Sequence, residues 1–237
     1  MSTDSLKYFK IAKKLNEELK KDPSARKLHF RGNIGSFSLI SLDRETPEQG
    51  KGGFKDEKKG WNFYKNEIDA LLATKKEKIR CGESRPTREK ELQAWIINYA
   101  INNEYQLPFA SGLKFLTSEL AFHTPEKIVN DILAIDDQGS LVVIELKSTR
   151  HKTTLEGQID AFCDVIVDKK DFFKELIALL APQRAWNGCV RKMIVWPDAN
   201  GKTRSDWNDI EEIRYKEKIG SDGPLIDYNN KGEIIFL

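Results

Sequence analysis

The sequence contains few of the residues that build disulfide frameworks and zinc sites. Its 237 residues include three cysteines and three histidines. Because Cys81, Cys163 and Cys189 are far apart in the sequence, we predict neither a disulfide framework nor a zinc site. This cysteine usage is typical of a protein in a reducing cytoplasm.

Long apolar segments are also missing. No apolar run approaches the ~18 to 20 residues needed to span a bilayer, and the first residues lack the apolar segment of a signal peptide. Hydrophobic residues make up 39% of the chain and charged residues 32%, and the length is sufficient to bury a substantial core. We therefore expect a folded cytoplasmic protein without a membrane partner.

The formal net charge of +2 conceals an uneven distribution. Residues 1–80 carry 19 Lys and Arg against 12 Asp and Glu, whereas residues 81–237 carry 20 against 25, so the two parts have net charges of +7 and −5. A basic part joined to an acidic part is typical of a protein that binds a polyanion with one part and a metal ion, through carboxylates, with the other. A solvated lysine-rich surface is the simpler explanation of the charge alone.

The first third of the chain predicts a small basic α+β region. Apolar spacing and glycine content predict a helix over 6–21, strands over 28–30 and 37–42, a loop over 46–60 and a helix over 61–80. Gly82–Pro86 interrupts the helical pattern, so we place the domain boundary there, between residues 1–81 and 82–237. The first domain would bind substrate or mediate assembly.

The second domain predicts an α/β fold with an α-β-β-β-α-β core. Thr87 is a typical N-cap for a helix over 88–101. The later elements are predicted as strands over 115–122, 128–135, 141–147 and 190–196, with helices over 154–167 and 171–180. Residues 207–237 would add edge strands such as 233–237. This order predicts a mixed sheet flanked by helices.

Two of these strands carry charges where a central strand is normally apolar. The apolar, β-branched-rich run 141–144 leads into Glu145 and Lys147, which share one face of the strand because side chains alternate with period two. Asp131 lies in the preceding strand, and the turn residues 136–139 predict a hairpin that brings Asp131 beside Glu145. Since buried charges are costly unless they are paired or bind a metal, this pattern indicates a functional site.

These residues resemble motifs of the PD-(D/E)XK nuclease superfamily, which has the restriction-endonuclease-like fold. The matching segments are Glu89-Lys90-Glu91-Leu92, Asp131 within residues 129–134, and Glu145-Leu146-Lys147. The opening Glu-x-Glu-Leu is similar to that of archaeal Holliday-junction resolvases and implies a catalytic role for Glu89, with Glu91 as the alternative. Gln158, followed by Phe162, is similar to the Gln-x-x-x-Tyr element of a RecB-like subset, and an ordinary solvated glutamine is the alternative. The residue before Asp131 is Asn130 rather than proline.

The resemblance covers residues 85–196 and implies hydrolysis of phosphodiester bonds with Mg²⁺ or Mn²⁺. Asp131, Glu145 and the backbone carbonyl of Leu146 would hold the cation, which activates a water and neutralises charge on the phosphate. With Glu89 and Lys147 the site carries a formal charge of −2, which one divalent cation balances. Lys147 would orient or deprotonate the water, or hold the phosphate.

The segment after this strand is basic and bears hydroxyl groups. Ser148, Thr149, Arg150 and Lys152 are predicted to contact phosphate, and an exposed charged loop is the alternative. The resemblance favours a DNA endonuclease of the restriction, defence or repair type, and nucleases of this fold often act as homodimers. Two other interpretations stay open: a DNA-binding or scaffold module of the same fold that does not turn over, and a nuclease that acts on RNA.

Overall fold

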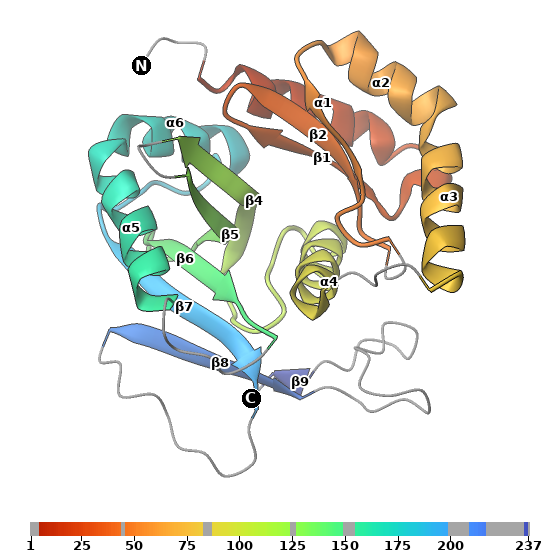
Figure 1. The fold of residues 1–237 in the computed structure, drawn as a ribbon. Coiled ribbons are helices and arrows are strands. Elements are labelled where there is room, and N and C mark those ends of the chain that lie inside the picture. The colour runs from red at the N-terminus through yellow and green to blue at the C-terminus, as the bar shows by residue number, and fades with distance from the viewer. Residues whose placement is uncertain are drawn as a thin grey trace. The chain divides into compact units, whose positions relative to one another are not determined.

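The computed structural model describes residues 5–43, 46–82, 87–123, 127–148, 155–198, 209–216 and 235–236. These residues fold into a mixed α/β protein with two β-sheets (Figure 1). The chain divides into two compact units, Met1–Asn98 and Tyr99–Leu237. This division falls within a helix, whereas the sequence places the boundary before that helix, so the domain boundary near residue 82 stays a prediction. Among the described helices, none combines the length and the apolar character needed to cross a membrane.

The first unit contains a three-stranded antiparallel sheet in the order β1-β2-β3. Its elements are α1 (Lys7–Leu19), the 3₁₀-helix η1 (Pro23–Ala25), β1 (Leu28–Asn33), β2 (Ser36–Ser41), β3 (Gly50–Phe54), α2 (Glu57–Asn66) and α3 (Ile68–Arg80), followed by α4 (Arg88–Asn102), which continues into the second unit. The predicted N-terminal helix and the first two strands are confirmed.

Helix α1 packs against β1 and β2 through a helically spaced apolar face. Its buried side chains there are Phe9, Ala12, Leu15 and Leu19. Asn16 adds a polar link to the sheet: its Nδ2 donates to the carbonyl oxygen of Phe30 at 2.7 Å, and its Oδ1 accepts from the backbone N–H of Phe30 at 2.7 Å. Because β1 is an edge strand, this side chain satisfies backbone groups that no neighbouring strand pairs with.

The structure corrects two sequence predictions in this unit. Residues 46–60 are not simply a loop, because they contain β3 and the start of α2. Asp56 caps α2, its carboxylate accepting from the backbone N–H of Lys59 at 3.0 Å, and this signal is obscured by the surrounding glycines. The predicted helix over 61–80 is also wrong as a single element, because α2 and α3 meet at Glu67, whose φ of −127° leaves the helical region.

The second unit contains a six-stranded mixed sheet in the order β4-β5-β6-β7-β8-β9. Its elements are β4 (Lys114–His123), β5 (Lys127–Ile135), β6 (Leu141–Leu146), α5 (Leu155–Asp168), α6 (Lys170–Leu180), β7 (Val190–Pro197), β8 (Ile210–Lys216) and β9 (Ile235–Phe236). Strands β4, β5 and β6 are antiparallel, whereas β6, β7 and β8 are parallel. The predicted mixed sheet is confirmed, and β8 and β9 fall within the region where edge strands are predicted.

Helices α5 and α6 lie beside this sheet (Figure 1). Four phenylalanines join them to β4, with the Phe122 ring 6.0 Å from Phe162, 5.7 Å from Phe172 and 5.8 Å from Phe173 between centroids. Every residue of β6 is buried, as expected for a central strand covered on both faces. Glu145 is therefore a charge near the end of an otherwise apolar strand, and Asp131 lies in the middle of β5.

Candidate active site

The candidate site begins where the backbone pairing of β5 and β6 ends. The two strands are joined by the predicted turn, in which the Gly139 N–H donates to the Asp136 carbonyl oxygen at 3.2 Å, and Gly139 has a φ of +87°. Paired residues run from Ile135 opposite Leu141 to Ile132 opposite Ile144. The next pair in this register is Asp131 and Glu145, so the hairpin predicted from the sequence brings these residues side by side.

Side chains take over the hydrogen bonding at this point of the strand pair. The Asn130 amide Nδ2 donates to the carbonyl oxygen of Ile144 at 3.2 Å. The Asp131 carboxylate accepts from the backbone N–H of Leu146 at 2.8 Å. These two contacts fix the Asp131 carboxylate against the β6 backbone, and they give the Asn130 amide a structural role.

Strand β6 is held on its other side by β7. Parallel pairing runs from Leu141 opposite Val190 to Leu146 opposite Val195, and the Lys147 N–H donates to the Val195 carbonyl oxygen at 2.9 Å. This pairing orients both Glu145, which is only 7% exposed, and Lys147. The Lys147 ammonium donates to Glu145 Oε1 at 2.8 Å. Glu145 and Lys147 thus form a largely buried ion pair, directly beside Asp131.

The electrostatics of Asp131 reflect this crowding. Burial, followed by the negative charge of Glu145, raises the pKa of Asp131 from 3.8 to about 7. The Leu146 N–H and the Lys147 ammonium oppose this rise, and the charge of Glu119 adds to it. Near neutral pH the site therefore resists holding two ionised carboxylates without further positive charge.

Glu119 is a residue of this neighbourhood that the sequence reasoning missed. It lies in β4, between Ser118, which pairs with Ile132, and Leu120, which pairs with Asn130, so it stands opposite Asp131 in the register. Its φ of +50° is unusual for a residue other than glycine and costs on the order of 1–3 kcal/mol. A lone glutamate in an alternating strand gives no sequence signal for this conformation.

The other predicted residues are placed in different ways. Ser148 follows Lys147 directly and is half-buried, whereas Thr149, Arg150 and Lys152 lie outside the described residues. Gln158 is exposed in the first turn of α5, a helix that packs on β5 and β6. Its role in the site stays a prediction.

The helix acids belong to the part of α4 in the first unit, residues 1–98. The predicted N-cap is present, since Thr87 Oγ1 accepts from the Lys90 N–H at 3.4 Å. Glu91 is 6% exposed and Glu89 is half-buried. Glu91 is thus the more buried of the two carboxylates, and the roles of both residues stay predictions.

No family model matches this chain, and no curated protein matches it. The assignment of a function therefore depends on the chemistry of the residues themselves.

The donor set is suited to Mg²⁺ or Mn²⁺. Asp131 and Glu145 supply hard carboxylate oxygens on adjacent strands, and their mutual repulsion is relieved by a cation. In the described part of the chain, no cluster of three or more His, Cys, Asp and Glu side chains is arranged to hold a metal. Mg²⁺ commonly uses one or two carboxylates and fills its remaining positions with water and substrate phosphate, so two carboxylates and a backbone carbonyl are a sufficient protein contribution.

Proposed function

We propose that this chain is a metal-dependent DNA endonuclease that hydrolyses phosphodiester bonds at the end of the β5–β6 pair. The observation that carries the proposal is the adjacency of Asp131, Glu145 and Lys147 in a largely buried strand end. A carboxylate whose pKa is raised to about 7, first by burial and then by the charge of Glu145, suits a site that functions with a bound cation. The order α4-β4-β5-β6-α5-α6-β7 supports the likeness to the PD-(D/E)XK nuclease superfamily.

The chain's own residues have distinct roles in this proposal. Asp131 and Glu145 bind the cation, assisted by the carbonyl of Leu146. A bound divalent cation supplies an acidified water and neutralises charge on the scissile phosphate. Hydrolysis forms a bond from the water oxygen to phosphorus and breaks the bond to the leaving sugar oxygen, which takes up a proton. Lys147 would hold a phosphate oxygen or orient the water.

The residues beyond this centre would position the substrate. Ser148 directly follows the lysine, and Thr149, Arg150 and Lys152 continue the same basic segment of the sequence. Arginine, lysine and hydroxyl groups are the usual contacts to a nucleic-acid backbone. Gln158 would add a helix amide to the centre, whereas the catalytic role expected of Glu89 or Glu91, both in the first unit, stays a prediction from the sequence.

The proposal is tested by incubating the full chain with supercoiled, linear and branched DNA in Mg²⁺, Mn²⁺ or chelator. Glu145→Gln keeps the size of the side chain and removes the charge, so we expect the variant to lose metal-dependent nicking. The matched control is Glu175→Gln, because Glu175 is an exposed carboxylate on α6 in the same unit. It should retain full activity.

Each of the other outcomes contradicts the endonuclease proposal in a different way. Cleavage retained by Glu145→Gln would assign the activity to a contaminant. DNA binding without cleavage under every metal would support the module that does not turn over. If the protein cleaves RNA but not DNA, and Glu145→Gln loses this cleavage, the proposed site is retained but its substrate is RNA.

A further inference from the structure

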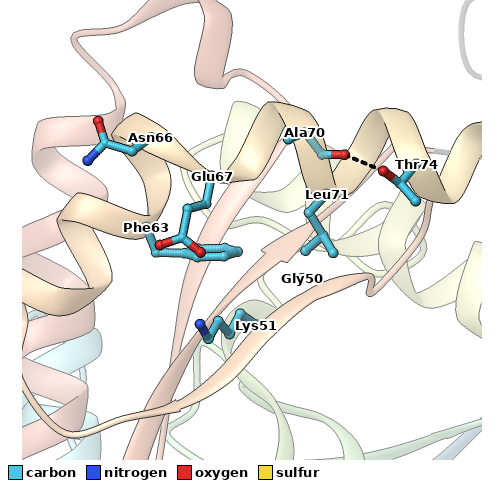
Figure 2. A pocket seen from close by; sticks show the side chains of 8 residues that line it. All are labelled: Gly50, Lys51, Phe63, Asn66, Glu67, Ala70, Leu71 and Thr74. Atoms are coloured by element: carbon cyan, nitrogen blue, oxygen red, sulfur yellow. Dashed lines mark hydrogen bonds between the residues drawn. The ribbon is translucent and has the colours of Figure 1, made fainter.

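A hollow lies in the first unit, between β3 and the α2–α3 pair. Its volume is about 510 Å³ and it is open to solvent. This size is within the roughly 300–1,000 Å³ of small-molecule sites. Figure 2 shows the residues that line it, which are Gly50, Lys51, Phe63, Asn66, Glu67, Ala70, Leu71 and Thr74.

The lining combines an aromatic ring, a cation and hydrogen-bonding groups. The Lys51 ammonium lies 5.1 Å from the centroid of the Phe63 ring, and Glu67 also lines the hollow (Figure 2). In the part of the chain that the structure describes, the side chains of Asn66 and Glu67 have no hydrogen-bond partner or ion pair. Both are therefore available to a ligand that offers donors and acceptors at a planar edge.

Strand β3 contributes its first two residues, Gly50 and Lys51, to the lining of the hollow. It is an edge strand with the sequence Gly-Lys-Gly-Gly-Phe, and only Phe54 is buried. Gly53 has a φ of +78°, and a Cβ built there would meet no atom within 4 Å. Glycines at an exposed edge allow a ligand to approach the main chain closely, as phosphate groups do in glycine-rich segments.

We propose that this hollow binds one nucleotide of a single DNA strand. The base would lie in the hollow against the side chains of Phe63 and Leu71, with its edge facing Asn66 and Glu67, and Lys51 would turn from the Phe63 ring to the phosphate. The net charge of +7 over residues 1–80 complements a polyanion. The choice of DNA rests on the proposed endonuclease function, whereas the groups that line the hollow do not depend on it.

The test measures binding of a short fluorescein-labelled oligothymidylate to the full chain by fluorescence anisotropy, in chelator and over a series of salt concentrations. Lys51→Gln should weaken binding and reduce the slope of log K against log salt by about 0.7, the value for one lost phosphate contact on a single strand. Its matched control is Lys20→Gln, which removes an exposed lysine at the C-cap of α1 that pairs with Glu17. The control should keep the slope of the wild type.

A second pair of variants tests whether the base enters the hollow. Ala70→Phe fills it without changing charge, and we expect the Kd to rise at least about fivefold while the salt slope stays the same. Ala73→Phe places the same ring on α3 at an exposed position that does not line the hollow, and it should bind as the wild type does. Circular dichroism checks that each variant is folded.

The inference is overturned if Lys51→Gln and Ala70→Phe both bind within twofold of the wild type. It is also overturned if the control variants lose as much affinity for the oligothymidylate. Equal weakening of duplex binding by Ala70→Phe would overturn it too, because a paired base cannot enter the hollow. Because the assay contains chelator, it measures binding whether or not the protein cleaves DNA. If the protein fails to cut DNA but shows these binding changes, the nucleotide site stands and the endonuclease function is wrong. If it cuts DNA but the variants bind as the wild type does, the endonuclease function stands and the nucleotide site is wrong.

Discussion

Asp131→Asn should stabilise the metal-free protein at alkaline pH. The amide oxygen of Asn can still accept from the Leu146 N–H, so the 2.8 Å contact is retained while the charge is removed. A pKa of about 7 against an ordinary value of 3.8 corresponds to about three pKa units, or ~4 kcal/mol. Because Asp131 is partly exposed, solvent screens part of this, and we expect a gain of ~2 kcal/mol in the free energy of unfolding.

The sign of the pH dependence follows from proton binding. Between pH 4 and 7 the folded wild type keeps a proton on Asp131 that the unfolded chain has released, so the stability of the wild type falls as pH rises through this interval. Asn does not titrate. The difference between variant and wild type should therefore be small near pH 4 and reach its maximum above pH 7.

Urea unfolding in chelator, followed by tryptophan fluorescence at several pH values, measures this difference. Asp164→Asn is the matched control, because Asp164 is an exposed carboxylate on α5 of the same unit, and it should show no such trend. Adding Mg²⁺ at about 100 times its Kd should stabilise the wild type by ~2.7 kcal/mol and the Asp131→Asn protein by much less. The reasoning is refuted if the variant is less stable than the wild type at pH 8, or if the difference does not change with pH.

Three further substitutions test other parts of the fold. Glu119→Gln should lower the pKa of Asp131, since the charge of Glu119 helps to raise it, and a carboxyl NMR titration would show the shift; an unchanged pKa would contradict their proximity. Gly139→Ala should destabilise the protein by more than ~1 kcal/mol in urea unfolding, because φ is +87° and the new Cβ would lie 2.2 Å from the Ala185 carbonyl oxygen. Asp22→Asn should lower the free energy of unfolding at neutral pH. Hydrogen bonds from Ser24, and then from the Tyr64 hydroxyl and Lys65, hold the pKa of Asp22 well below its ordinary value. The wild type therefore loses this advantage as the pH falls from the ordinary pKa through the folded-state pKa, and below the folded-state pKa the two proteins should be equally stable. A constant difference at every pH would contradict this account.

The hairpin of β5 and β6 could be predicted from the sequence because its signals are local. A β-branched-rich run, a turn ending in glycine and period-two alternation fix both the pairing and the faces of the strands. These rules place Asp131 beside Glu145 before any coordinates are known. The ion pair of Glu145 with Lys147 follows from the same alternation.

The features that the sequence does not predict depend on contacts between distant segments. Strand β3 is rich in glycine, a poor strand former, and its pairing with β2 shifts register between Phe37 and Leu39. Next to this shift, a Cβ on Gly50 would meet the Leu39 carbonyl oxygen at 1.9 Å. The positive φ of Glu119 has the same kind of origin, since it depends on the pairing of β4 with β5. Neither conformation has a short-range signal in the residue types.

The end of the β5–β6 ladder explains why a carboxylate can be kept in a strongly apolar sheet. A regular continuation of the ladder would pair the backbones of residues 131 and 145, and their carboxylates would repel without compensation. Here the Asn130 amide and the Asp131 carboxylate bond to the β6 backbone instead, so Asp131 is fixed in place although its charge is disfavoured. Replacing this arrangement by well-packed apolar residues would be expected to stabilise the fold. In the proposed function, a cation at these oxygens would offset the cost of keeping Asp131 here.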